Sequence, residues 1–424
     1  MRLNTSIILA ASATLIAGLV TSVPAHAAPR SQPGQPIAKG TTITRDLFGM
    51  HVSGAQNGVW PTIQFGSLRI WDKDTAWSHI EKTPGVYDWT KLDFIVDNAT
   101  KNGVTDLMFV LAGTPAWASS TPTSTGHPGQ FPGEQGMPTD LALWDRWVEA
   151  VATRYKGRID SYQPWNEANL PTFFNGTPEQ MAELTKRAHD VIARVDPAAK
   201  IVAPSTGTRL GAPFRRFYPR YLAALAERGW PVDAFAAHTY PASLGTPVSR
   251  QALAREWAQM LRTAGAPNLP LYDTEINFGL AGPGAANPYQ NIQGKRAQNW
   301  AALAYLDSLR LGISRAYWYY WSQQPTPLLG IQMTPNSPAA TAVSTLQKWI
   351  VGATFQGCRS KANGAVTCNF AKGGERFQIV WAERGTRGFK VARNAQQVCN
   401  LNNTCKPLKA NKRIRTSGPV YLGP

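Results

Sequence analysis

The chain alternates between short apolar runs and longer segments in which apolar residues recur every three or four positions. Eight of the short runs fit β-strands, because they are rich in apolar and β-branched residues and are bounded by polar or turn-forming residues. They cover residues 47–53, 67–72, 105–113, 159–167, 200–206, 232–240, 270–277 and 315–321. Strands that alternate with helices predict a parallel sheet with right-handed crossover connections.

Helical patterns separate most of these runs. Between residues 140 and 155, one apolar stripe is formed by Leu141, Trp144, Val148, Val151 and Tyr155. Another helix is predicted after Thr177, a candidate N-cap that is followed by Pro178 and, three residues after the cap, by Gln180. Similar patterns cover residues 249–264, 294–311 and 338–350. The connection between the first two apolar runs lacks the pattern of a full helix.

Eight strand–helix units within roughly 300 residues predict a (β/α)8 barrel, an α/β fold. A doubly wound open sheet is the alternative, and it would carry a glycine-rich phosphate-binding turn after an early strand. The sequence contains no such turn. We therefore expect residues 28–350 to form a barrel without a nucleotide-binding loop.

The pattern changes after Gly352, where short apolar runs are separated by Gly-, Asn- and Lys-rich turns. Residues 351–424 are therefore predicted to form a small antiparallel β domain. This region holds all of the cysteines of the chain, Cys358, Cys368, Cys399 and Cys405. The sequence does not choose among the three possible pairings, and we expect the two local ones. A zinc site is the competing interpretation, but its usual two-residue spacing and any nearby histidine are missing.

The N-terminus has the pattern of a secretory signal peptide over residues 1–27. Arg2 precedes an apolar run that is short for a membrane span, and small residues before Ala27 offer a cleavage site. A membrane anchor is the alternative, but the short run and the cleavage motif argue against it. No other long apolar stretch occurs, so we expect an exported protein, extracellular or associated with a bacterial cell envelope, without membrane insertion after signal removal.

Positive charge is concentrated near the C-terminus. The formal net charge of the chain is +17, and residues 351–424 carry 13 Lys and Arg against only Glu375 and Glu383. A basic surface of this kind suits an anionic glycan, a cell-envelope polymer or nucleic acid, and export disfavours nucleic acid as a partner. A solvated basic face without a partner is the alternative.

Two glutamates occupy the positions where a barrel carries its chemistry, the C-terminal ends of strands. The fourth apolar run ends in Asn166 and Glu167, and the seventh contains Glu275 near its end. Two carboxyl groups that flank one small molecule are typical of glycoside cleavage, in which one is protonated and the other ionised. A structural salt bridge is the alternative for either glutamate alone.

Other strand-end residues fit a supporting role around these carboxylates. Arg69 is a plausible charge partner, and His238 and Tyr240 lie beside the seventh run in the predicted barrel order. Trp117 and Trp321 are candidate platforms for sugar stacking. Each of these residues also has a structural interpretation, as an ion pair or as part of the core. Residues 119–140, rich in Pro, Gly, Ser and Thr, are either a wall of the cleft or an ordinary surface insertion.

The sequence resembles the clan A glycoside hydrolases and, within that clan, glycoside hydrolase family 39. The resemblance spans roughly residues 45–350 and rests on segments 67–93, 165–169, 236–241 and 273–277. The clan implies a retaining mechanism in which Glu167 is the acid/base, Glu275 the nucleophile and Asn166 a contact to the sugar 2-hydroxyl. By the same resemblance, the residues that support Glu275 are Arg69, His238 and Tyr240.

The family includes β-xylosidases, α-L-iduronidases and bacterial exopolysaccharide hydrolases. With the Glu167 and Glu275 pair as the basis, we expect a β-linked oligo- or polysaccharide as the substrate. Residues 351–424 do not match the accessory β-sandwich of the β-xylosidases, which weakens the case for a xylosidase substrate. We expect no cofactor and no metal, because the histidines are scattered and no Asp-rich loop is present. The competing functional interpretation is a non-catalytic carbohydrate- or cell-envelope-binding protein on a barrel scaffold.

Overall fold

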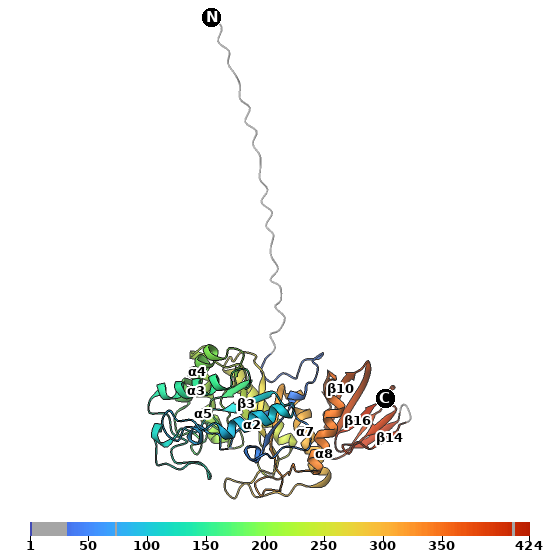
Figure 1. Ribbon diagram of the computed structural model, residues 1–424. Helices are drawn as coiled ribbons and strands as arrows, with labels where there is room; N and C mark the ends of the chain where they lie inside the picture. Colours follow the sequence, from blue (N-terminus) through green and yellow to red (C-terminus); the bar gives the residue numbers. More distant parts are fainter. Residues whose placement is uncertain (2–31, 73, 409–411) are drawn as a thin grey trace. The chain divides into compact units, whose positions relative to one another are not determined.

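Eight parallel strands form one sheet in the computed structural model of the protein (Figure 1), which describes Met1 and residues 32–72, 74–408 and 412–424. The order along the sheet is β5-β4-β3-β2-β1-β8-β7-β6. Isolated parallel bridges from Val202 to Ala234 and from Gly207 to His238 connect the two edges, so that the sheet closes. The strands are β1 (Phe48–Val52), β2 (Ser67–Ile70), β3 (Asp106–Val110), β4 (Ser161–Gln163), β5 (Lys200–Ile201), β6 (Phe235–His238), β7 (Leu271–Ile276) and β8 (Ile313–Trp321). The predicted (β/α)8 barrel is confirmed.

Side chains fill the interior of the barrel, because successive residues of a strand point to opposite faces of the sheet. Met108 of β3, Tyr272 of β7 and Tyr317 of β8 belong to one small buried cluster inside the ring of strands. Their strand neighbours Leu107 and Phe109 belong instead to the large cluster under the helices. The barrel is therefore a packed core, and its site has to lie at an end.

The helices follow the predicted pattern closely. Thr177 forms the predicted capping box with Gln180 at the start of α4, and α7 and α8 have the predicted bounds. The connection from β1 to β2 contains only the short 3-10 helix η2 (Ala55–Asn57), as expected. The α-helices are α1 (Trp77–Ile80), α2 (Thr90–Lys101), α3 (Leu141–Arg154), α4 (Pro178–Val195), α5 (Gly211–Glu227), α6 (Pro247–Thr263), α7 (Gly294–Leu311) and α8 (Pro338–Ile350).

The C-terminal part of the chain is antiparallel, as predicted. A six-stranded sheet has the order β14-β13-β16-β11-β10-β9, and β12 pairs with β15 in a separate ribbon. Disulfides join Cys358 to Cys368 and Cys399 to Cys405, so the expected local pairing is confirmed. The strands are β9 (Thr354–Ser360), β10 (Ala365–Lys372), β11 (Glu375–Ala382), β12 (Arg387–Lys390), β13 (Gln397–Cys399), β14 (Cys405–Pro407), β15 (Arg413–Thr416) and β16 (Val420–Gly423).

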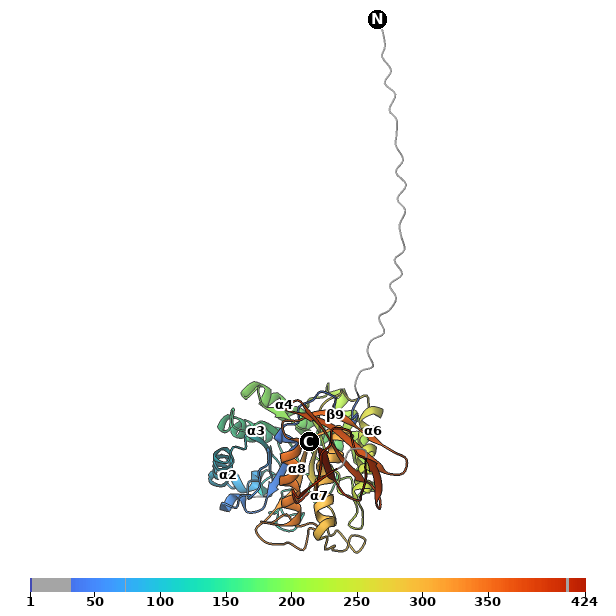
Figure 2. The ribbon, with the colours of Figure 1, turned by 90° about the vertical axis from the view of Figure 1, so that its right-hand side faces the viewer.

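The C-terminal sheet packs on α7 and α8, in front of which it lies in Figure 2. Arg310 of α7 forms an ion pair of 2.8 Å with Glu383, and its guanidinium lies 5.6 Å from the ring centroid of Trp381. Trp349 of α8 packs on Tyr421 of β16. Residues Gln32–Pro424 accordingly form one compact unit, and the division at residue 350 stays a prediction.

The predicted signal peptide, residues 1–27, lies outside the described residues except for Met1. Within the described part of the chain, no helix has both the length and the apolar character needed to cross a membrane.

Candidate active site

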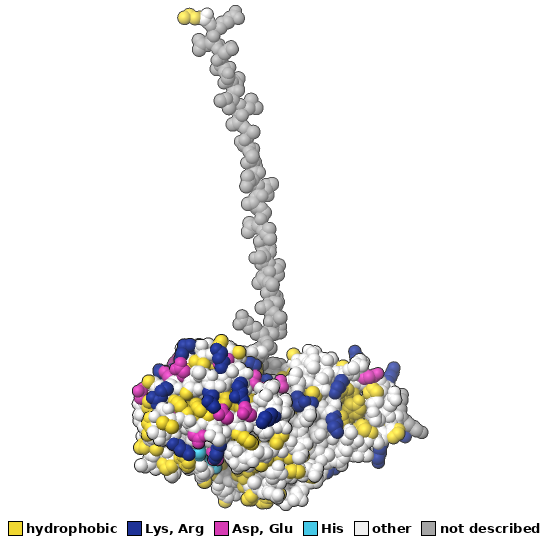
Figure 3. Space-filling view, in the orientation of Figure 1, with side chains coloured by type: hydrophobic (Ala, Val, Ile, Leu, Met, Phe, Trp, Pro, Cys, Tyr) yellow, Lys and Arg dark blue, Asp and Glu magenta, His cyan; other side chains and the backbone are white. Residues whose placement is uncertain are grey.

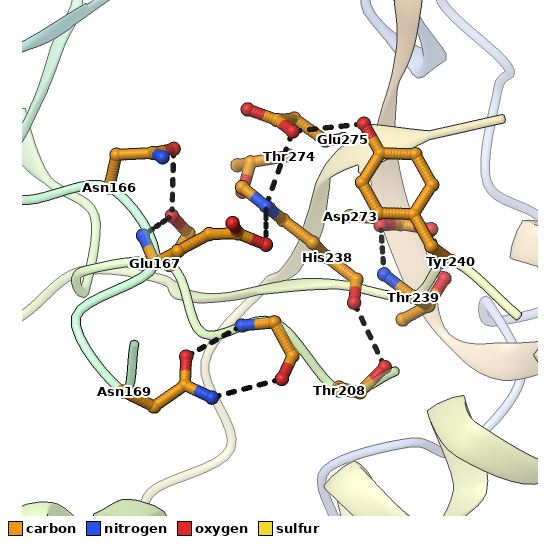
Figure 4. Close-up of polar contacts among 12 residues, drawn as sticks. Asn166, Glu167, Asn169, Thr208, His238, Thr239, Tyr240, Asp273, Thr274 and Glu275 are labelled. Carbon is orange, nitrogen blue, oxygen red and sulfur yellow. Dashed lines mark hydrogen bonds and ion pairs between the residues drawn. The ribbon is translucent and has the colours of Figure 1, made fainter. Parts of the chain in front are cut away.

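Glu275 lies near the end of β7 and is surrounded by hydrogen-bond donors (Figure 4). Nη1 of Arg69, from β2, donates to Glu275 Oε1 at 2.8 Å. The hydroxyl of Tyr240, two residues beyond β6, donates to Oε2 at 2.9 Å. Only 7% of the Glu275 side chain is exposed. This carboxylate therefore receives both a buried cation and a phenol, each of which favours its ionised form.

Glu167 lies in the loop after β4, not at the end of a strand as predicted. β4 ends at Gln163, and Glu167 has a left-handed backbone with φ of 40°. Its backbone N–H donates to Ser205 Oγ at 3.0 Å, which fixes the loop against the segment after β5. The unusual φ turns the side chain back over the barrel end, where 17% of it remains exposed.

Gly207 provides the space that the Glu167 carboxylate occupies. A Cβ atom at this position would lie 2.6 Å from Glu167 Oε1, which is inside van der Waals contact. The Asn169 side chain fixes this approach, since it accepts from Gly207 N at 2.8 Å and donates to Gly207 O at 3.0 Å. Only a residue without a side chain allows the carboxylate to lie here.

His238 joins the two carboxylates. Its Nδ1 lies 3.1 Å from Glu167 Oε1 and 3.3 Å from Glu275 Oε2, and Figure 4 shows both contacts. The two oxygens can be no farther apart than the sum of these distances, 6.4 Å. The pair of glutamates predicted from the sequence is therefore brought together at one site.

The two carboxyl groups differ in their surroundings. Burial raises the pKa of Glu167 to about 7, against a weaker opposing effect of Arg209 and Arg69. Burial also raises the pKa of Glu275, but there the guanidinium of Arg69 acts in the opposite direction. Because Arg69 and Tyr240 donate directly to Glu275 and not to Glu167, we assign the ionised form to Glu275 and the proton to Glu167.

His238 is neutral at ordinary pH, because burial lowers its pKa to about 4. Its Nδ1 faces two carboxylate oxygens, so the proton of the neutral ring is placed on Nδ1. Its Nε2 is buried and has no hydrogen-bond partner among the described residues. The imidazole thus acts as a donor between the two glutamates and adds no charge.

Arg69 organises the polar groups behind the carboxylates. Besides Glu275, its guanidinium donates to Gln163 Oε1 and to Asn166 Oδ1, each at 2.9 Å. No part of the Arg69 side chain is exposed. The guanidinium therefore links β2, β4, the loop after β4 and β7 into one rigid arrangement.

A second buried arginine supports the segment that carries Tyr240. Arg250 pairs with Asp273 at 2.8 Å, and Asp273 Oδ1 accepts from the backbone N–H of Thr239 at 3.0 Å. Asp273, which has no distinct role in the sequence pattern, is thus a structural residue that fixes β7 to the end of β6.

The two predicted tryptophan platforms lie outside this polar cluster. Trp117, in the 3-10 helix η3 (Ala116–Ala118), is half-buried; its indole N–H donates to Glu81 O at 2.9 Å, and its ring packs on Trp77. Trp321 is fully buried. Since a sugar needs an exposed ring face, the predicted stacking role of Trp321 is not supported, while that of Trp117 stays a prediction.

Three residues near the carboxylates have no role assigned from the sequence. Tyr319 of β8 is half-buried, with its ring edge-on to those of His51 and Tyr240 at 5.1 and 6.2 Å. Arg209 lies within electrostatic range of Glu167 and donates to Leu280 O at 2.8 Å. Exposed Asp72 lies within electrostatic range of Glu167.

Residues 119–140 pack beside the loop that carries Glu167. His127 N donates to Thr172 O at 3.2 Å, and the His127 ring stacks on Phe173 at 5.1 Å. Asn175 N donates to Gln135 O at 2.9 Å. The Pro- and Gly-rich insertion therefore lies on the Glu167 side of the barrel end.

Within the described ranges, no group of three or more His, Cys, Asp or Glu side chains is arranged to hold a metal ion. The site is built instead from two carboxyl groups, one guanidinium, one imidazole and one phenol. Such a set stabilises positive charge that develops between the carboxylates and supplies and accepts a proton.

Comparison with known proteins supports the same architecture. No known family profile matches the sequence, and no curated protein is similar to it in sequence. Solved structures, in contrast, match over nearly the whole chain. A family 39 β-xylosidase from Caulobacter crescentus has a TM-score of 0.63 and 18% identity, with 92% of this chain and 98% of that chain covered.

Two further structures extend this likeness. A family 39 glycoside hydrolase from Bacteroides cellulosilyticus WH2 has a TM-score of 0.63 and 17% identity, covering 90% of this chain and 82% of its own. A family 30 endoxylanase from Clostridium papyrosolvens C71 has a TM-score of 0.56 and 12% identity, covering 92% of this chain and 99% of its own. At these identities the similarity establishes the fold, so the resemblance to clan A glycoside hydrolases is confirmed at that level.

Proposed function

We propose that the protein is a secreted retaining glycoside hydrolase that cleaves a β-linked oligo- or polysaccharide. The observation that carries the proposal is the contact of one imidazole nitrogen, His238 Nδ1, with both Glu167 and Glu275. Retaining enzymes hold their two carboxyl groups about 5–5.5 Å apart, and inverting enzymes about 6.5–9.5 Å. The upper limit of 6.4 Å between the two facing oxygens favours retention.

In the first step, a carboxylate oxygen of Glu275 attacks the anomeric carbon as the bond from that carbon to the leaving oxygen breaks. Glu167, with its raised pKa, gives its proton to the leaving oxygen. Arg69, Tyr240 and His238 hold the Glu275 carboxylate in one orientation for the attack. The products of this step are a glycosyl ester on Glu275, an alcohol and an ionised Glu167.

In the second step, Glu167 takes a proton from a water molecule, and the water oxygen attacks the anomeric carbon of the ester. The bond to Glu275 breaks and the carboxylate is restored. Ester formation had removed the negative charge of Glu275, so the pKa of Glu167 falls during the intermediate and the side chain can act as a base. The Nδ1–H of His238 can donate to Glu275 while Glu275 is ionised, and to Glu167 once Glu167 is the ionised carboxylate.

Asn166 is suited to bind the sugar hydroxyl next to the reacting carbon. Its Oδ1 accepts from Arg69 at 2.9 Å, so its Nδ2 remains for a substrate hydroxyl. Tyr319 and Trp117 are half-buried aromatic residues near this end of the barrel. We assign sugar contacts to them and regard residues 119–140 as one wall of the cleft.

Export is supported by the signal pattern of residues 1–27 and by the two disulfides, which are typical of proteins from oxidising compartments. The excess of Lys and Arg in residues 351–424 supports a polysaccharide that carries negative charge, such as an acidic cell-envelope glycan.

The assignment of the two glutamates is tested with a panel of aryl β-glycosides that includes a xyloside, a glucoside and a glucuronide. Glu275→Ala and Glu167→Ala should each lower the turnover of a cleaved polysaccharide at least about a thousandfold. Azide should rescue both variants on aryl glycosides. It should yield a glycosyl azide of inverted configuration with Glu275→Ala and one of retained configuration with Glu167→Ala, because it replaces a different partner in each.

Glu149→Gln is the matched control, since Glu149 is a surface residue paired with Arg194 at 2.9 Å. Full activity of either alanine variant would refute the assignment of that glutamate. A cyclophellitol-type epoxide should label Glu275 in the wild type. Absence of both labelling and hydrolysis over a broad glycan screen would favour a protein that only binds carbohydrate.

A further inference from the structure

The outer face of the C-terminal sheet carries a groove that the proposed reaction does not use. It has a volume of about 630 Å³ and runs across β9, β10 and β11. Its lining includes four cationic residues, Lys39, Arg359, Lys361 and Arg376, and no carboxylate. We call this feature the basic groove. None of its lining residues belongs to the carboxylate site of the barrel.

The four cations of the basic groove are all exposed, and none forms an ion pair with a carboxylate of the described residues. Other cations of the chain are neutralised locally; Arg220, for example, pairs with Glu179 at 2.9 Å and Arg215 with Glu256 at 2.6 Å. Of the two acidic residues in the C-terminal part, Glu383 is already bound to Arg310 of α7. The groove therefore presents uncompensated positive charge to solvent.

The floor of the basic groove is polar and rigid. Asn369 of β10 and Gln378 of β11 are cross-strand partners, and Gln378 Nε2 donates to Asn369 Oδ1 at 2.9 Å. The Cys358–Cys368 disulfide joins β9 to β10 beside them. Lys39 comes from a segment far away in the sequence, and the aliphatic part of its side chain lies over Gly357. Amide groups below and cations above suit a ligand that carries both hydroxyls and anionic groups.

The same features disfavour other polyanions. Single-stranded nucleic acid is bound on exposed aromatic rings, but the two aromatic residues at the groove, Phe370 and Phe377, are buried. A membrane surface requires apolar side chains that enter the lipid, and no large hydrophobic residue of the described C-terminal sheet is exposed. A polysaccharide with regularly spaced carboxylates needs neither feature.

We propose that the basic groove is a second, non-catalytic binding site for an anionic polysaccharide of the uronic-acid class. The choice of a carbohydrate as the ligand rests on the proposed function, whereas the need for negative charge rests on the groove itself. The site holds the protein on a polymer while the barrel site acts on the chain.

The test measures binding of the full-length mature protein to polygalacturonate by isothermal titration calorimetry at low salt, with Glu275→Gln to prevent cleavage. The groove variant is Arg359→Gln/Lys361→Gln/Arg376→Gln. The matched control, Lys390→Gln/Arg413→Gln/Arg415→Gln, removes the same charge from exposed positions of β12 and β15. We expect the groove variant to lose at least about tenfold in affinity and the control less than about threefold. Thermal unfolding confirms that both variants fold.

Equal losses in both variants would overturn the groove as a site, since they would reveal only unspecific attraction. If neutral dextran bound as tightly as polygalacturonate, the proposed site would also be refuted. The same holds if a single-stranded oligonucleotide or anionic lipid vesicles bound more tightly than polygalacturonate. Hydrolysis assays on the unmodified protein keep the two proposals apart. Groove-dependent binding without any hydrolysis would refute the proposed function alone, and hydrolysis with groove-independent binding would refute the groove alone.

Discussion

The barrel end and the basic groove both gather polar side chains, but they treat charge in opposite ways. At the barrel end, Arg69 and Glu275 are buried and bonded to each other. In the basic groove, Arg359 and Arg376 are exposed and lack a carboxylate partner among the described residues. Figure 3 shows the same contrast on one face of the molecule. Basic and acidic side chains alternate over the helices at the left, whereas basic ones predominate over the C-terminal strands at the right.

The difference follows from what each region is proposed to do. Chemistry needs charges that are already oriented and shielded from water, because reorganisation would add to the barrier. Attraction of a polymer needs charges that remain available, because a charge already paired gives no net attraction to a ligand. Residues 32–350 carry 28 Lys and Arg against 24 Asp and Glu, and residues 351–424 carry 13 against 2. Composition alone therefore separates the two regions.

Arg69→Gln should have the largest effect of the substitutions that test this contrast. It leaves the buried Glu275 carboxylate without its cation, which should lower the free energy of unfolding by about 3–5 kcal/mol and reduce kcat by at least about a hundredfold. Urea unfolding and turnover measure the two effects. Arg220→Gln, which removes an exposed partner of Glu179, should cost less than about 1 kcal/mol. If the two variants lost the same free energy of unfolding, the proposed difference between buried and exposed charges would be contradicted.

Gly207→Ala should lower kcat by about ten- to a hundredfold, because the new methyl group displaces the Glu167 carboxylate against which it would lie. The measurement is turnover on an aryl glycoside with a poor leaving group, which depends on the acid. Gly388→Ala is the control, since a Cβ there makes only ordinary contacts. If the Gly207 variant kept full turnover, the observed position of Glu167 would not be the active one.

Arg209→Gln should shift the pH profile of kcat/KM. Glu167 must be protonated in the first step, so activity is lost as the pH rises through its pKa of about 7. Arg209 lowers that pKa, and its removal should raise the pKa and move the alkaline limb of the profile to higher pH. If the alkaline limb of the pH profile did not move and KM rose, Arg209 would contact the substrate without affecting the pKa of Glu167.

The groove variant should show the smallest effect on stability. Its three cations have no ion-pair partner among the described residues, so the free energy of unfolding should change by less than about 0.5 kcal/mol. Urea unfolding at low salt measures it. A loss of 2 kcal/mol or more, on the order of a buried interaction, would place these residues among the structural ion pairs after all.

Much of the fold could be predicted because each signal is local. The period of apolar residues gave α7 and α8 with their bounds, and the cap at Thr177 marked the start of α4. The sequence did not choose among the three cysteine pairings, but the expected local one is found, with partners ten and six residues apart. Glu275 was found because it lies near the C-terminal end of a predicted strand, where a barrel carries its chemistry.

What the sequence missed depends on side-chain direction and on distant segments. In residues 317–321, every position is aromatic, so the period of two cannot show that Tyr319 and not Trp321 approaches the carboxylates. The direction of the Glu167 side chain depends on the left-handed backbone of Glu167 itself and on the space left by Gly207, forty positions later in the chain. Lys39 reaches the basic groove only through the folded arrangement of the two ends of the chain.

The packing of the C-terminal sheet on α7 and α8 bears on how the protein can be engineered. Phe355, Val366 and Trp381 are fully buried and belong to the same apolar cluster as the barrel helices. Cutting the chain after α8 would uncover that apolar face and favour aggregation of the shortened barrel. The C-terminal sheet is therefore not a detachable module, and exchange with another polymer-binding unit would have to preserve this buried face.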